Sequence, residues 1–97
     1  MGKHNKFLVL LAVSVALVFA TFSRVNAAAT ITVNSTADNQ ANDGSCTLRE
    51  AIIASNTDTA SGAAVGECAA GSGAGDVIEF GITGTGVKTI PISSTLP

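Results

Sequence analysis

The chain has 97 residues, a net charge of −2 at neutral pH and 46% apolar residues, with two cysteines and neither tryptophan nor tyrosine. Residues 28–97 keep all seven acidic residues but only two of the five basic ones, Arg49 and Lys88, so this part has a net charge of minus five. No basic patch remains there to neutralise phosphates, and the composition therefore argues against a nucleic-acid partner.

Residues 1–27 have the three-part layout of a secretory signal peptide. Lys3 and Lys6 form a basic start, residues 7–22 carry no charge, and small residues precede a cleavage site before Ala28. The alternative is an uncleaved anchor, but the apolar run is shorter than the roughly 20 residues that cross a bilayer core. We therefore expect a secreted or cell-surface protein that contacts the membrane only through its signal peptide during export.

A mature segment of this size usually needs a disulfide, a metal ion or a partner surface to be stable. Cys46 and Cys68 are its only cysteines, and an oxidising compartment would let them pair. Two free thiols or an intermolecular bridge are the alternatives. Closing the loop should stabilise the fold by about 3 kcal/mol in the chain-entropy model.

The first expected element of the mature segment is a strand over residues 28–33, where the alternation around Ile31 and Val33 predicts one buried face. Residues 34–45 are rich in Asn, Asp and Ser, which favour an irregular loop. The clustered oxygens also suggest a calcium loop. The spacing misses the EF-hand pattern, however, because Asp43 stands where the glycine belongs, so ordinary turns are favoured.

A capping box predicts that a short helix begins after Thr47. The hydroxyl of Thr47 can accept from the amide of Glu50, and the carboxylate of Glu50 can accept from the amide of Thr47. The helix should end near residues 55–58, and such a short helix is stable only when its apolar face docks on other elements. The adjacent Arg49 and Glu50 could suggest a catalytic pair. Helix capping already explains the presence of Glu50, however, and exposure to solvent or pairing with a carboxylate explains Arg49. We therefore predict no catalytic residue, metal ligand or cofactor in this chain.

Residues 57–75 form a long loop for a compact domain, and Cys68 is the expected pin. Two further strands are expected beyond it. The run DVIEFGI places Ile78 and Phe80 on one face, and VKTIPI offers Ile90 and Ile92 to the same side. The pattern predicts a mainly β fold with one short α-helix.

The run CTLREAI with its following Asn resembles the CSLREA domain, as do the flanking runs ITVNSTAD, NDGS, GDVIEF and KTIPI. Thr47 replaces the signature Ser and preserves the capping chemistry. Members of this family form the N-terminal part of large secreted or surface proteins, commonly ahead of right-handed parallel β-helix repeats of the pectin-lyase type. The resemblance implies that residues 28–97 are the N-terminal cap and first coil of such a β-helix, and that the chain is a truncated part of it.

The resemblance also implies that the helix lies as a lid across the open end of the first coil. Terminal caps with a polar outer face protect solenoid proteins in this way. The expected lid core is Leu48, Ile52, Ile53, Ile78, Phe80, Ile90 and Ile92. Its partners would be the downstream β-helix coils and, through the parent protein, an extracellular glycan or a host or cell surface.

The function expected from these features is that of a non-catalytic capping module in an exported β-helical surface protein, adhesin-like or glycan-contacting. The alternative is the N-terminal fragment of a β-helical polysaccharide lyase or hydrolase, whose catalytic coils would lie downstream. A small free-standing secreted protein is a third interpretation, against which the small core counts.

Signal-peptide cleavage can be tested on exported material. N-terminal sequencing should find Ala28, within two residues, as the first residue of the exported protein. Material that retained Met1 would contradict the prediction of a cleaved signal peptide.

Overall fold

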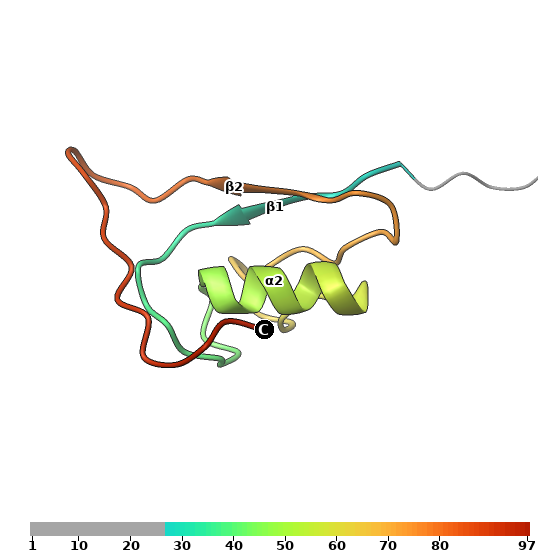
Figure 1. Ribbon diagram of the computed structural model, residues 1–97, viewed down its shortest axis with the longest axis horizontal. Helices are drawn as coiled ribbons and strands as arrows, with labels where there is room; N and C mark the ends of the chain where they lie inside the picture. The colour runs from blue at the N-terminus through green and yellow to red at the C-terminus, as the bar shows by residue number, and fades with distance from the viewer. Residues whose placement is uncertain (1–26) are drawn as a thin grey trace, which may run out of the picture.

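The computed structural model describes residues 27–97, which form three elements in the order β1 (Thr30–Val33), α2 (Leu48–Thr57) and β2 (Val77–Phe80) (Figure 1). The predicted signal peptide lies outside the described residues, apart from its last position. No helix in residues 27–97 combines the length and the apolar character that crossing a membrane requires.

The two strands form a parallel sheet in which Thr30 lies opposite Val77 and Val33 lies opposite Phe80. The ladder extends one residue beyond β2, because the amide of Gly81 donates to the carbonyl of Val33 over 2.8 Å. A parallel pair needs a long crossover connection, and the segment that contains α2 supplies it. The ribbon shows α2 running beside β1, with β2 beyond β1 (Figure 1).

The core lies between β1 and α2. Ile31 and Val33 are 0% exposed, and the helix meets them with the small residues Ala51 and Ala54, which are 0% and 1% exposed. The small side chains let the helix approach the strand closely, and the cysteine pair completes the buried cluster. The partly buried side chains around this cluster are Leu48, Ile78, Ile82 and Ile90.

The end of α2 is set by Asp58, which takes the left-handed conformation with φ of 52°. Asp is one of the few residues that adopt this conformation readily, because its short side chain can hydrogen-bond to nearby backbone. Here the Asp58 carboxylate accepts from the amide of Gly73 over 2.7 Å, which also attaches the long loop to the helix end.

The prediction of a mainly β fold is only partly right. The helix has 10 residues and each strand has four, so the fold is mixed and much of it is irregular. The strand predicted over residues 87–92 is wrong, because this segment is not in a strand. Pro91 has no amide hydrogen to give to a ladder, and such a residue is confined to edges or irregular structure.

The predicted lid core also needs correction. Leu48, Ile78 and Ile90 do pack around the core, but Phe80 is 61% exposed and Ile92 is 45% exposed. Ile52 and Ile53 are partly buried and lie outside the buried cluster. The reason is the position of the helix: α2 packs mainly against β1 and leaves the end of β2 uncovered.

The predicted disulfide is confirmed: Cys46 and Cys68 are bonded, with a Cα–Cα distance of 4.7 Å. The two loops that carry them meet closely. A Cβ atom on Gly66 would lie only 2.1 Å from the carbonyl oxygen of Gly44, so no larger residue fits there. The bond therefore joins the segment just before the helix to the long loop, next to the place where these two segments pack closely.

Replacing both cysteines by serine should lower the free energy of unfolding by about 3 kcal/mol, because the loop between them is no longer closed in the unfolded chain. Urea unfolding of the exported protein measures this loss. Val65→Ser is the matched control, since Val65 lies in the same loop and is 98% exposed. Equal stability of the double variant and the control would contradict a structural role for the bridge.

Candidate functional site

The first feature of the site is the buried start of α2. The capping box predicted there is present: the amide of Glu50 donates to the Thr47 hydroxyl over 3.2 Å, and the amide of Thr47 donates to Glu50 Oε2 over 3.0 Å. Thr47 is 0% exposed and Glu50 is 3% exposed. A helix end buried in this way needs such partners for its free amides.

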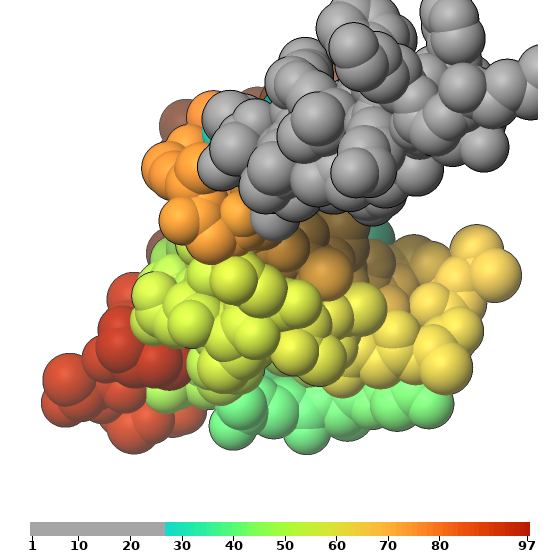
Figure 2. Space-filling view, turned by 90° about the vertical axis from the view of Figure 1, so that its right-hand side faces the viewer, coloured from blue at the N-terminus to red at the C-terminus, as the bar shows by residue number. Residues whose placement is uncertain are grey.

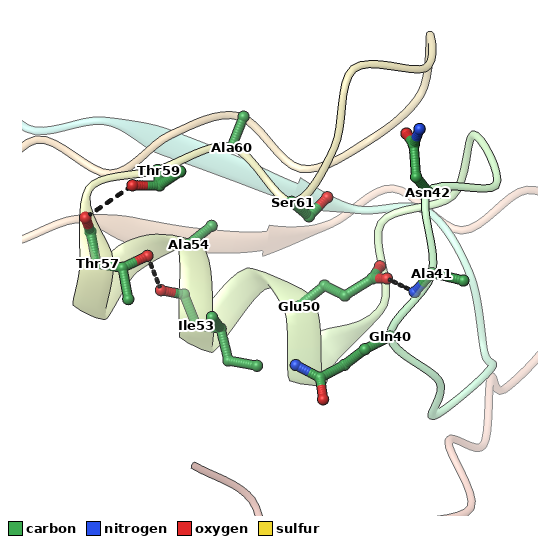
Figure 3. Close-up of a pocket in the computed structure, with 10 residues that line it drawn as sticks. All are labelled: Gln40, Ala41, Asn42, Glu50, Ile53, Ala54, Thr57, Thr59, Ala60 and Ser61. Carbon is green, nitrogen blue, oxygen red and sulfur yellow. Dashed lines mark hydrogen bonds between the residues drawn. The ribbon is translucent and has the colours of Figure 1, made fainter.

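Glu50 also organises the preceding loop, a role that the sequence did not reveal. Its second oxygen, Oε1, accepts from the amide of Ala41 over 2.7 Å, while the Thr47 hydroxyl donates to the carbonyl of Asn39 over 2.9 Å. Figure 3 shows the hydrogen bond between Ala41 and Glu50 at one wall of a hollow of about 320 Å³ between α2 and the loops around it. Among residues 27–97, Glu50 is the only ionisable side chain that lines this hollow, and both of its oxygens already bind main-chain amides.

Asn34 joins the end of β1 to both loops of the disulfide. Its Oδ1 atom accepts from the amide of Cys46 over 2.7 Å, and its Nδ2 atom donates to the carbonyl of Gly66 over 2.8 Å. Its own amide donates to the carbonyl of Cys46 over 3.0 Å. The side chain therefore continues the strand into the cysteine-bearing segment with side-chain hydrogen bonds in place of a ladder.

Arg49 forms a clasp with Asp38 and the C-terminal segment. Its Nε and Nη2 atoms donate to the two carboxylate oxygens of Asp38 over 3.0 and 3.1 Å, a bidentate pair. The same guanidinium donates to the carbonyls of Ser94 and Thr95, each over 2.9 Å. Figure 2 shows the C-terminal segment, in red, beside the yellow-green helix. The expectation that a carboxylate accounts for Arg49 is confirmed.

Three carboxylates have lowered pKa values for the same physical reason, since each accepts several hydrogen bonds in its charged form. The Arg49 guanidinium, with the amide and hydroxyl of Ser93, holds the pKa of Asp38 well below its usual range. The hydroxyl of Ser61 and the amides of Gly44 and Asp43 lower the pKa of Glu67.

Asp76 is the third of these carboxylates. The amide of Ala29 is the largest cause of its lowered pKa, followed by the hydroxyl of Ser55 and then the hydroxyl and amide of Ser72. Asp76 directly precedes β2 and Ala29 directly precedes β1, so this carboxylate joins the starts of the two strands.

The second feature of the site is the apolar end of β2, which we define as Phe80, Ile82, Lys88 and Ile90. These four residues line an open hollow of about 410 Å³. The only polar side chain among them is Lys88, whose Nζ atom donates to the carbonyl of Thr85 over 3.1 Å. Chemically, this surface can bind apolar side chains or an extended strand.

The calcium-loop interpretation of residues 38–43 finds no support in the geometry. Asp38 binds Arg49, and Asp43 accepts from the amide of Ser45 and from Asn39 Nδ2 over 3.0 and 3.1 Å, which is turn chemistry. Within residues 27–97, no group of three His, Cys, Asp or Glu side chains is placed to hold a metal ion.

Several residues of the site were missed because their partners are far away in the sequence. Asp38 and Ser93 are 55 positions apart, and Ala29 and Asp76 are 47 apart. No periodic pattern links such pairs. The one available signal was compositional: an acidic chain rich in loops has many main-chain amides that need acceptors.

Comparisons with known proteins add no relative to this picture. No protein-family model, curated protein or solved structure matches the chain.

The lowered pKa values predict acid sensitivity with a defined sign. A carboxyl group whose pKa is lowered by folding stabilises the fold fully above its unfolded pKa, about 3.9 for Asp, and this contribution is lost as the pH falls through the folded pKa. We therefore expect the free energy of unfolding to be steady above about pH 5 and to decrease below about pH 4.

Asp38→Asn tests how much of this pH dependence comes from the clasp between Arg49 and Asp38. The variant should be less stable than the wild type at neutral pH, and this difference should shrink as the pH falls, because the wild-type carboxyl becomes protonated. Urea unfolding across the acid range measures it. Ser93→Ala removes only the hydroxyl donor to Asp38. Its loss of stability at neutral pH, and the change of that loss with pH, should therefore both be smaller than those of Asp38→Asn. A stability difference that stays constant with pH would contradict this assignment.

Proposed function

We propose that residues 28–97 cap the first coil of a parallel β-solenoid in an exported protein. The observation that carries this proposal is the change in burial across the sheet. Ile31 and Val33 of β1 are 0% exposed, whereas Phe80, the β2 partner of Val33, is 61% exposed. The apolar side chains of β1 are therefore fully covered, whereas the last side chain of β2 is not.

The register of the sheet supports the proposal. Successive coils of a parallel β-solenoid stack their strands in parallel, and here Ile31 lies beside Ile78 while Val33 lies beside Phe80. Parallel sheets are normally buried on both faces, and a two-stranded sheet is marginal in water. A further parallel strand on β2 would cover the exposed apolar side chains and extend the row of stacked residues.

The arrangement of the helix supports the same direction of growth. Because α2 packs mainly against β1, the order across the molecule is α2, β1 and then β2. The apolar face of β1 is thus covered by a helix whose start is held by a disulfide and a capping box, whereas the apolar side chain at the end of β2 is uncovered. Solenoid proteins need terminal units of this kind, with one polar outer side and one side that receives the next repeat.

The chemistry of the acidic residues supports a structural role. The carboxylates of Asp38, Glu50, Glu67 and Asp76 each accept from main-chain amides, and Asp38 also pairs with Arg49. The disulfide favours an oxidising location, so the proposed place of action is outside the cell or at its surface. The proposed partners are the downstream coils, and any glycan or host surface would be contacted by the parent protein.

Grafting tests the proposal. A parallel β-solenoid that has lost its own N-terminal cap should regain a cooperative thermal transition when residues 28–97 are fused in its place. Ala54→Asp should abolish the gain, because Ala54 is 1% exposed and an unpaired charge buried there costs several kcal/mol. Asn56→Asp, on the exposed side of the same helix, should retain it.

Two results would overturn the proposal. One is a fused solenoid that melts no more cooperatively than the solenoid without a cap. The other is release of oligosaccharides from a polysaccharide by the exported chain itself, which would place catalysis in these residues.

A further inference from the structure

We propose that the free edge of β2 is a self-association surface, through which two copies of this chain pair as antiparallel strands centred on Phe80. This inference does not rest on the proposed function. It concerns the chain when no downstream coil occupies the edge, and it names the register and the residues of the contact.

The main-chain groups of β2 define the surface. The amides of Val77 and Gly81 donate to β1, to the carbonyls of Ala29 and Val33 over 2.9 and 2.8 Å. Because amides alternate in direction along a strand, those of Ile78 and Phe80 point away from β1. In residues 27–97 these two amides have no main-chain partner, so the edge can form a new ladder.

The side chains of β2 make this edge apolar on one face. Ile78 and Phe80 lie opposite Ile31 and Val33, and therefore share the face that α2 covers over β1. Ile82 continues this row, and Phe80 and Ile82 line the open hollow at the apolar end of β2. Glu79 lies on the other face, where its carboxylate accepts from the Thr32 hydroxyl over 2.8 Å.

Two copies of one strand can pair about a two-fold axis in only a few registers, and charge selects among them. An axis at Glu79 would place two carboxylates directly opposite each other, which is destabilising. An axis at Ile78 would place Phe80 opposite Asp76, so an apolar ring would face a charged group. An axis at Phe80 avoids both conflicts.

The register centred on Phe80 is also the most complementary. It places Phe80 against Phe80 of the second copy, Ile78 against Ile82, and Glu79 against Gly81. The outward amides of Ile78 and Phe80 then both enter the new ladder. Aromatic and branched side chains on one face of a strand pair are the favourable combinations. The contact is two-fold and closed, so it produces a dimer whose sheet has four strands, with both helices on one face.

The first experiment measures association of the 97-residue chain, expressed with nothing fused after Pro97 and purified after export, by sedimentation at increasing protein concentration. The wild type should pass from monomer to dimer. Phe80→Lys should remain monomeric, because it places a charge at the centre of the contact. Val65→Lys should dimerise as the wild type does, since Val65 is 98% exposed and lies outside β2. A monomeric wild type, or equal association of both variants, would overturn the proposal.

The second experiment tests the register by cross-linking. In the proposed pair, the two copies of position 80 are directly opposite, with a Cα–Cα distance of about 5.5 Å, within the range that a disulfide spans. The two copies of position 79 are offset by two residues, at roughly 7–8 Å. Phe80→Cys should therefore form a covalent dimer on mild oxidation and Glu79→Cys should not, with Cys46–Cys68 confirmed intact by peptide mapping. Cross-linking at position 79 in preference to position 80 would overturn the register.

Discussion

The disulfide between Cys46 and Cys68 is the interaction on which the rest of this structure depends. It lies at the point where three segments meet: the end of β1 through Asn34, the start of α2 through Thr47, and the long loop through Gly66. A helix of 10 residues would not persist alone in water. The bridge holds the residue that precedes its N-cap, and the helix is held along its length by Ala51 and Ala54 against β1 and by polar contacts of Arg49 and Ser55.

Carboxylates accept hydrogen bonds from many of the main-chain amides that would be bonded within sheet ladders in a larger fold. With only eight strand residues, four in each strand, most main-chain amides must find other acceptors. Glu50 binds amides from the helix cap and from the preceding loop, and Glu67 binds the amides of Asp43 and Gly44. The acidic character of the chain thus has a structural explanation, and the fold carries a dependence on pH as a result.

The apolar side chains of the two strands are covered unequally, and the two sides of the molecule therefore differ. The apolar side chains of β1 are buried under α2, whereas Phe80 at the end of β2 is exposed, and within residues 27–97 the amides of Ile78 and Phe80 have no main-chain partner. Exposed apolar edges of this kind are normally protected in soluble proteins. The proposed cap and the proposed dimer are two ways of covering this edge, one by a strand of the same polypeptide and the other by a second copy. They share one surface and therefore exclude each other.

Local features of this protein were readable from the sequence because their causes are local. The capping box needs only Thr47 and Glu50 three positions apart. The alternation of Ile31 and Val33 predicts the strand β1. Because the chain has only two cysteines, a single intramolecular pairing is possible. The clasp between Arg49 and the C-terminal segment joins residues 45 and 46 positions apart, and no pattern encodes it.

Tertiary structure alone decided which apolar residues are buried. The sequence grouped Ile78, Phe80, Ile90 and Ile92 as one apolar set, since hydrophobicity and period are all that a sequence displays. Burial depends in addition on where a helix of limited length comes to lie, and α2 reaches β1 but leaves the end of β2 open. Phe80 is exposed for that reason, although its own side chain is as apolar as those in the core.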